Sequence, residues 1–376
     1  MSKPFLFLTC ALFWGFWVHA GPGVEARTID RRPVAASQPE EPLTTLSFID
    51  LPVITTGNAS TLSQLAEIRF GPWELVMAVA WSPDGENLAI AAGNSIYVYH
   101  AQEGKKLWSY EIGALTHSLA YSPDGAWLAA GSRDGYVRIW PVAALTTSGQ
   151  ASPALAFQAH RKGVNSLAFS PVASPIGLVL ASGGNDAVAR FWDPGTGENL
   201  GLMVGGTFAV PSLAFLPDAT QLAVTNGDRI RLRQVGSERI VGTFASDEPL
   251  YSLAVSPDGG FLAAGGTDNL IRLWKPEQAF RTGQQEYIGP VVLSGHSGRL
   301  GTYRSLIWQV TFNPAGDLLA SAGGDATLRL WDVGSGDLLQ TLTAHPGGAV
   351  CLAFRPDGGA LASGGLDSVV RIWAVR

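Results

Sequence analysis

The chain has 376 residues, 46% of them hydrophobic and 15% charged, so it can bury a large core and does not belong to the disordered class. Its formal net charge of −6, with no cluster of Lys and Arg along the sequence, argues against a surface for nucleic acid or anionic lipid. The 45 glycines and 23 prolines are typical of many short strands joined by tight turns, which predicts an all-β protein.

The N-terminal residues have the pattern of an export signal. Lys3 precedes an uncharged apolar run from Phe5 to Val18, and small residues follow it, as they do at a cleavage site. We therefore expect residues 1–26 to be a signal peptide, or alternatively an uncleaved anchor that would be the only contact with a membrane. The protein is then expected to be secreted, periplasmic or held in the cell envelope. Residues 27–61 are rich in Pro, Ser, Thr and charge, which predicts a linker.

From residue 62 to residue 376 one motif recurs seven times. The copy at Ser122 reads "SPDGAWLAAGSRDGYVRIW". The prolines of the seven copies lie at positions 83, 123, 171, 217, 257, 314 and 356, and are separated by 40, 48, 46, 40, 57 and 42 residues. Such a period in an all-β sequence indicates one supersecondary unit per copy.

Turn chemistry explains the first half of each copy. Ser, Pro and Gly at the first, second and fourth positions are those that a type I turn prefers, so Asp124 is expected to be a turn residue. The next run, "WLAAGS", is too continuously apolar for a strand with one solvent-exposed face, and it predicts a strand buried on both faces.

The seven copies resemble the WD-repeat family, in which blades of four antiparallel strands form a β-propeller. The resemblance implies an all-β, seven-bladed propeller over residues 62–376. The last copy ends at Trp373, which leaves its blade without an outer strand. The segment from Gln64 to Gly71 matches the one before the last copy, so it is expected to supply that strand and close the ring.

Three copies contain a His, Ser, Asp and Trp at matching positions. This set suggests nucleophilic catalysis, but it occurs three times, and the resemblance implies a buried hydrogen-bond relay instead. Blades two and five have Ala130 and Ala264 in place of the serine and are expected to be less rigid. The relay residues are His160, Ser182, Asp186, Trp192, His296, Ser321, Asp325, Trp331, His345, Ser363, Asp367 and Trp373.

The resemblance also implies a face for partner binding, reached by the turns that lead into each inner strand. The residues four positions before the end of each inner strand are expected to surround the central mouth. We call these the ring residues: Met77, His117, Asn165, Pro211, Tyr251, Trp308 and Val350. Arg133 is expected beside them, and a long loop before Phe312 is expected to add Arg299, Tyr303 and Arg304. Met77 and Pro211 could alternatively fill the channel.

No catalytic motif, metal-ligand spacing or cofactor-binding motif is apparent in the sequence, so no catalytic residue, metal or cofactor is expected. The main hypothesis for the function is that the protein is a non-catalytic scaffold that binds a protein or peptide and no nucleic acid. The alternative is an envelope propeller that binds a small molecule in its mouth, as lactonases, quinoproteins or peptidase-associated domains do. The sequence does not fix the oligomeric state.

Overall fold

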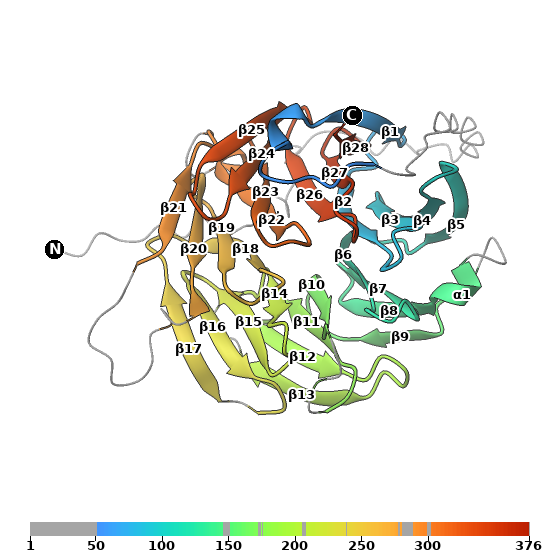
Figure 1. The fold of residues 1–376 in the computed structure, drawn as a ribbon. Coiled ribbons are helices and arrows are strands. Elements are labelled where there is room, and N and C mark those ends of the chain that lie inside the picture. The colour runs from blue at the N-terminus through green and yellow to red at the C-terminus, as the bar shows by residue number, and fades with distance from the viewer. Residues whose placement is uncertain are drawn as a thin grey trace, which may run out of the picture. The chain divides into compact units, whose positions relative to one another are not determined.

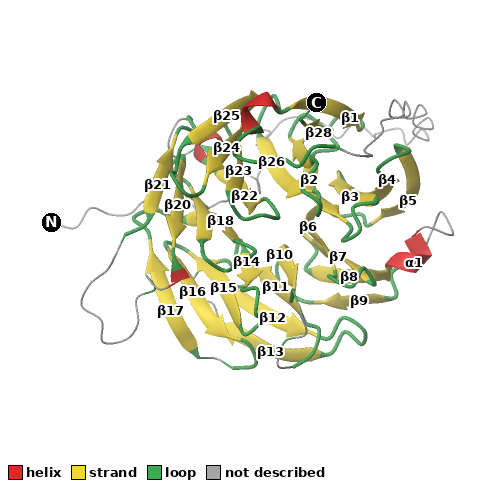
Figure 2. Ribbon diagram, viewed as in Figure 1, coloured by secondary structure: helices red, strands yellow, loops and turns green. Residues whose placement is uncertain are grey.

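The computed structural model describes residues 51–145, 151–171, 174, 176–204, 208–237, 239–276, 279, 289–298 and 302–375. Within these ranges nearly all regular structure is strand, and the predicted all-β propeller is confirmed: seven four-stranded antiparallel sheets are arranged as blades (Figures 1 and 2). The predictions for residues 1–26 and for the linker up to residue 50 lie outside the described residues.

Each blade is named here with its innermost strand first. Blade 1 is β2 (Val76–Trp81), β3 (Asn87–Ala92), β4 (Ser95–His100) and β5 (Lys105–Glu111). Blade 2 is β6 (Thr116–Tyr121), β7 (Trp127–Ser132), β8 (Tyr136–Pro141) and β9 (Leu155–Gln158), with the short helix α1 (Val142–Leu145) before β9. Blade 3 is β10 (Val164–Phe169), β11 (Leu180–Gly184), β12 (Val188–Trp192) and β13 (Asn199–Val204).

The remaining blades follow the same order. Blade 4 is β14 (Leu213–Phe215), β15 (Gln221–Asn226), β16 (Arg229–Gln234) and β17 (Ile240–Ala245). Blade 5 is β18 (Leu250–Val255), β19 (Leu262–Gly266), β20 (Leu270–Trp274) and β21 (Val291–Ser294). Blade 6 is β22 (Ile307–Phe312), β23 (Leu318–Gly323), β24 (Thr327–Asp332) and β25 (Leu338–Thr343). Blade 7 is β26 (Ala349–Phe354), β27 (Leu361–Gly365), β28 (Val369–Ala374) and β1 (Ser63–Arg69).

Burial is greatest in the second strand of each blade. The innermost strand of every blade contacts the innermost strands of its two neighbours, which places these strands around the centre. The second strand is buried along nearly its whole length, as in β7, and this confirms the prediction of a strand covered on both faces. The outermost strand has the most exposed residues: β25 has only half-buried and exposed ones, and β1 and β17 have single buried residues between them. The core is therefore shared between adjacent blades.

The turn that begins the copy in blade 2 has the predicted chemistry. In blade 2 the Gly125 N–H donates to the Ser122 carbonyl at 2.9 Å, and Gly125 has φ +70°, a conformation that glycine adopts without strain. Asp124 accepts hydrogen bonds from the Ser122 hydroxyl and, at 3.0 Å, from the Ala126 N–H. These bonds lower the pKa of the Asp124 carboxyl, which is therefore committed to the turn.

The N-terminal strand closes the ring, as predicted. β1 pairs antiparallel with β28, with Ile68 opposite Val370 and Glu67 opposite Arg371. In Figure 1 the blue β1 lies along the red β28 near the C-terminus. Since β28 is thereby paired on both sides, β1 becomes the outer edge of blade 7.

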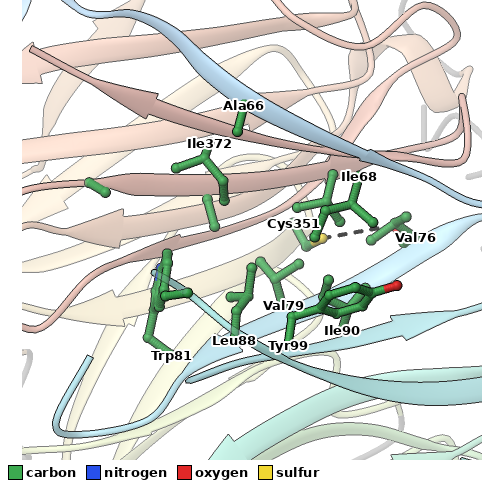
Figure 3. Close-up of a cluster of buried hydrophobic side chains, with 14 of the residues drawn as sticks. Ala66, Ile68, Val76, Val79, Trp81, Leu88, Ile90, Tyr99, Cys351 and Ile372 are labelled. Carbon is green, nitrogen blue, oxygen red and sulfur yellow. Dashed lines mark hydrogen bonds between the residues drawn. The ribbon is translucent and has the colours of Figure 1, made fainter. Parts of the chain in front are cut away.

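Blades 7 and 1 share one apolar cluster at this closing seam. Ile68 and Ile372 from blade 7 belong to the same buried cluster as Val76, Leu88 and Tyr99 from blade 1 (Figure 3). Side chains also bond across the seam: the Cys351 thiol donates to the Val76 carbonyl at 3.8 Å, and the Trp81 indole N–H donates to the Ala353 carbonyl at 3.2 Å. The seam is therefore packed as a core rather than joined only at its edge.

Residues 51–61, at the end of the segment predicted to be a linker, and the adjoining Leu62 contact blades 6 and 7. Ile54 and Ala59 are fully buried in a cluster with residues of both blades. The Ile54 N–H donates to the Gly358 carbonyl at 2.9 Å, and the Gln340 side-chain amide donates to the Leu62 carbonyl at 3.0 Å. A single 3₁₀ turn, η2 (Ala59–Thr61), leads from this segment into β1.

Candidate functional site

The innermost strands of six blades begin with a β-bulge. In blade 1, Val76 pairs with Ala92 and Ala78 pairs with Ala91, so Met77 has no opposite residue on β3. The same one-residue shift occurs at β6, β10, β18, β22 and β26. The residues left without an opposite neighbour are Met77, His117, Asn165, Tyr251, Trp308 and Val350.

These six bulged residues are six of the seven predicted ring residues. A bulge leaves one residue out of the ladder and redirects its side chain, which is why bulges recur next to functional sites. In blade 4, Pro211 precedes the short strand β14, which begins only at Leu213. Because proline cannot donate to a ladder, this inner strand is shortened instead of bulged.

The ring residues differ in exposure. Met77, His117, Asn165 and Tyr251 are half-buried, whereas Trp308 is only 9% exposed. Tyr251 packs edge to face against Trp308, with ring centroids 5.3 Å apart and an interplanar angle of 82°. The two rings act as one aromatic unit, in which Tyr251 is the more accessible member.

His117 and Arg133 lie close together on blade 2. Burial, assisted by the Arg133 charge, lowers the pKa of His117 to about 4, so the imidazole is neutral at pH 7. The Arg133 N–H donates to the Leu115 carbonyl at 2.8 Å, which fixes the β7–β8 turn against the loop leading into β6. A shallow depression there is lined by Asn94, Gly113, Ala114, Leu115, Arg133 and Asp134.

Asn165 joins the ring to the next blade. Its side-chain amide donates to the Asn185 side-chain oxygen at 2.9 Å and to the Val210 carbonyl at 3.2 Å. Both donor hydrogens are thereby used, and only the side-chain oxygen remains to accept a bond from a partner.

The long loop before β22 is described only in part. Tyr303 lies in a 3₁₀ turn, η4 (Tyr303–Ser305), and is 37% exposed. The backbone of Arg304 belongs to the same turn, but its side chain lies outside the described residues, as does all of Arg299. The placement of these two arginines beside Trp308 stays a prediction.

The three predicted relays have nearly identical geometry. In each, the histidine Nδ1 lies 2.7–3.0 Å from an aspartate oxygen, and its Nε2 lies 2.7–2.8 Å from a serine hydroxyl. The tryptophan indole N–H donates to the same hydroxyl at 2.8–2.9 Å. The three sets are His160, Ser182, Asp186 and Trp192; His296, Ser321, Asp325 and Trp331; and His345, Ser363, Asp367 and Trp373.

The electrostatics and burial of the relays suit a structural role. Burial lowers the pKa of all three imidazoles, so they are neutral at pH 7. Burial alone would raise the pKa of Asp325, but hydrogen bonds from His296 and its neighbours hold it at about 2. The three serines are fully buried, so a substrate has no access to their hydroxyls.

Blades 2 and 5 keep the corresponding aspartate without a histidine partner. Asp134 forms an ion pair with Arg138 at 2.7 Å, and Asp268 forms one with Arg272 at 2.6 Å. The relay blades have the same type of pair, as between Asp186 and Arg190 at 2.9 Å, so the carboxylates of blades 2 and 5 keep the guanidinium partner and lack only the imidazole. The lower rigidity expected of these blades stays a prediction.

The sequence analysis missed Trp73, which lies in the loop leading into β2. This side chain is 89% exposed, and the backbone φ is +77°. The turn is closed by the Glu74 N–H, which donates to the Gly71 carbonyl at 3.0 Å. Pro72 and Trp73 occupy its second and third positions, the third being one where a type II turn favours glycine. The sequence "GPW" carried this signal, because proline after glycine marks such a turn.

A family comparison identifies the repeats. The model for "WD domain, G-beta repeat" matches residues 113–141, 151–193, 238–275, 291–332 and 336–374, which together make up more than half of the chain. The chain belongs to the WD40 family. Blades 1 and 4 of this WD40 propeller lie mostly or wholly outside the matches, and their third strands carry Tyr99 and Arg233 where the other blades have tryptophan.

Several curated WD40 relatives resemble the chain over most of its length. It is 25% identical over 257 residues to the serine-threonine kinase receptor-associated protein of Gallus gallus, covering 68% of this chain and 66% of the relative. It is 27% identical over 293 residues to "Cell division cycle 20.1, cofactor of APC complex" of Arabidopsis thaliana, covering 74% of this chain and 58% of the relative. The matches thus span less than two thirds of either relative.

These relatives correct the prediction of export. They are intracellular proteins, and this finding contradicts the expectation of a secreted, periplasmic or envelope protein. That expectation rested on Lys3, the apolar run from Phe5 to Val18 and the small residues after it, and an apolar run of that length is also common in segments with other roles. The run itself lies outside the described residues. Among the residues that are described, no helix is long and apolar enough to cross a lipid bilayer.

Proposed function

We propose that this WD40 propeller is a non-catalytic scaffold that docks a protein segment or peptide over its ring residues. The WD40 relatives act as protein-interaction scaffolds, and their names describe association with a kinase receptor and with the APC complex. Both names specify a protein partner rather than a reaction, which favours binding over catalysis for this chain.

The observation that carries the proposal is the repeated bulge. Six independent strands place an extra residue at the same position, and the aromatic pair Tyr251 and Trp308 lies among them. Aromatic, methionine and arginine side chains are enriched at the centres of interfaces because they bury a large area at modest cost in side-chain entropy. Arg133, Tyr303, Arg299 and Arg304 are proposed to extend this surface.

The alternative of a small-molecule enzyme lacks a comparable observation. Among the described residues, no three His, Cys, Asp or Glu side chains lie close enough together to hold a metal ion. His117, on the ring, is neutral at pH 7 and half-buried, and the relay serines are inaccessible. A site for general acid-base chemistry needs titratable groups that reach a substrate.

A site-specific cross-link tests the proposed surface. The photoreactive residue p-benzoylphenylalanine replaces Tyr251 on the ring or, as a matched control, Ile240, which is 46% exposed on the outermost strand β17. We expect a protein partner to be cross-linked at position 251 and not at position 240. The combined substitutions Trp308→Ala and Arg304→Ala should abolish that product in a protein that keeps its melting temperature.

Two results would overturn the proposal. One is equal cross-linking at positions 251 and 240, and the other is unchanged affinity of the captured partner for the Trp308→Ala, Arg304→Ala variant. Because Trp308 is buried, Tyr251→Ala serves as a milder variant if the double substitution lowers the melting temperature.

A further inference from the structure

Charged residues are unevenly distributed over the face that carries the ring residues. They are brought together by a contact that recurs between neighbouring blades. The turn between the second and third strands of one blade lies against the loop leading into the next blade. At the seam of blades 2 and 3, the N–H groups of Ala159 and His160 donate to the Gly135 carbonyl at 2.9 and 3.0 Å. A side chain at Gly163 would lie only 3.2 Å from the Arg133 Cα.

This contact gathers cations that are separated in the sequence. Arg133 comes from the β7–β8 turn, and Arg161 and Lys162 come from the loop leading into β10. Arg161 and Lys162 are exposed, and neither side chain forms an ion pair within the part of the chain that the structure describes. The nearby carboxylates Asp134 and Asp186 are bound by Arg138 and Arg190 of their own blades. We call Arg133, Arg161 and Lys162 the basic seam.

The same contact two blades further on gathers anions. The Ser246 N–H donates to the Asp228 carbonyl at 2.8 Å, and the Leu250 N–H donates to the Gly227 carbonyl at 2.9 Å. Asp228, Asp247 and Glu248 are therefore brought together at the seam of blades 4 and 5, and all three are exposed. Arg229 lies 3.7 Å from Asp228, so the net negative charge of this seam comes from Asp247 and Glu248. One face of a chain with a net charge of −6 thus has a basic seam and an acidic seam.

We infer that the basic seam binds an acidic segment, rich in Asp and Glu, of the protein partner. The inference rests on the proposed function, and it adds the chemistry and the position of the partner. The seam adjoins the ring, because Arg133 lies beside His117 and the loop with Arg161 and Lys162 leads directly into Asn165. The acidic seam repels the same segment, so the uneven charge sets where the segment lies on the face.

A charge reversal with a matched control tests the inference. The probe is a fluorescein-labelled hexaglutamate peptide, and its binding to the full chain is measured by fluorescence anisotropy at about 0.15 M ionic strength, where the Debye length is about 8 Å. Arg161→Glu should weaken binding by about tenfold, because it replaces an attractive unit charge by a repulsive one at close range. Arg229→Glu makes the same change in charge beside Asp228, where Arg229 is exposed, and should change the affinity by less than about twofold, because two blades separate it from the seam and solvent screens the interaction.

Four other results would contradict the inference. Equal effects of the two variants, or no binding of hexaglutamate at millimolar concentration, would overturn the inference. Inorganic phosphate that displaces the peptide at micromolar concentration would assign the seam to phosphate groups instead. Self-association of the wild-type chain that Arg161→Glu abolishes would make a second copy the occupant. Both of these also contradict the inference.

The test separates this inference from the proposed function. If a partner is cross-linked at position 251 but Arg161→Glu leaves its affinity unchanged, the proposed docking surface is supported and the proposed acidic segment is refuted. If hexaglutamate binding depends on Arg161 while the ring variants bind the partner with unchanged affinity, binding at the basic seam is supported and docking over the ring residues is refuted.

Discussion

Ile68, on the closing strand, should contribute much more to stability than an exposed isoleucine on another outermost strand. Ile68 lies on the outermost strand of blade 7 but is only 7% exposed, because it packs into the cluster with Val76 and Tyr99 of blade 1 (Figure 3). Replacing a buried isoleucine with alanine removes its transfer free energy and leaves a cavity, which costs about 2–5 kcal/mol. We therefore expect Ile68→Ala to lower the free energy of unfolding by that amount.

Ile240→Ala is the matched control, since Ile240 also lies on an outermost strand, β17 of blade 4, and is 46% exposed. Its loss should cost less than about 1 kcal/mol, as is usual for surface substitutions. Urea denaturation followed by far-ultraviolet circular dichroism compares the two variants at pH 7. Equal costs would show that β1 adds no packing across the closing seam, and would refute the view that blades 7 and 1 share a core.

Three further results are expected. Ser363→Ala removes the oxygen to which the Trp373 indole donates and should lower the free energy of unfolding by about 1–3 kcal/mol, measured by urea denaturation; a cost near zero would exclude a stabilising relay. His117, whose folded pKa of about 4 lies below the ordinary value near 6.5, should destabilise the fold as pH falls from about 6.5 to about 4, because the unfolded chain takes up the proton first. The loss is at most about 2 kcal/mol at pH 5, and stability curves of His117→Gln against pH should lack it; parallel curves would contradict the shift. Trp73→Gly should raise the melting temperature by relieving a positive φ that costs about 1–2 kcal/mol, and a lower melting temperature would show that the exposed indole packs on the protein.

Local chemistry explains why so much of the fold could be predicted from the sequence. The turn around the recurring proline is encoded within four residues, which read Ser-Pro-Asp-Gly in three copies, and the seven recurrences of that proline gave the number of blades. The closing strand could be predicted because the last copy ends at Trp373 and a matching segment exists near residue 64. The ring positions followed from counting along each inner strand, although counting did not reveal that a bulge produces them.

Exposure and long-range contact could not be predicted in this way. Trp308 was expected at the rim, but Tyr251 packs against it and it is almost buried, which depends on two blades meeting. The basic seam is absent from the sequence as a cluster, because Arg133 and the pair Arg161 and Lys162 belong to different repeats. Export was predicted from a lysine, an apolar run and small residues near the N-terminus, a pattern that depends on composition and not on any contact in the fold.

The charged seams coincide with places where neighbouring blades are held together by side chains. The Ser118 hydroxyl of blade 2 accepts the Leu167 N–H of blade 3 at 2.9 Å, and the Ser212 hydroxyl before blade 4 accepts the Leu253 N–H of blade 5 at 3.1 Å. Each bond fixes one inner strand relative to the next, so the loops above the seam are held in position before a partner arrives. Preorganised charges lose less conformational entropy on binding than charges on independent loops. The position of the basic seam therefore favours recognition of an acidic segment without rearrangement of the blades.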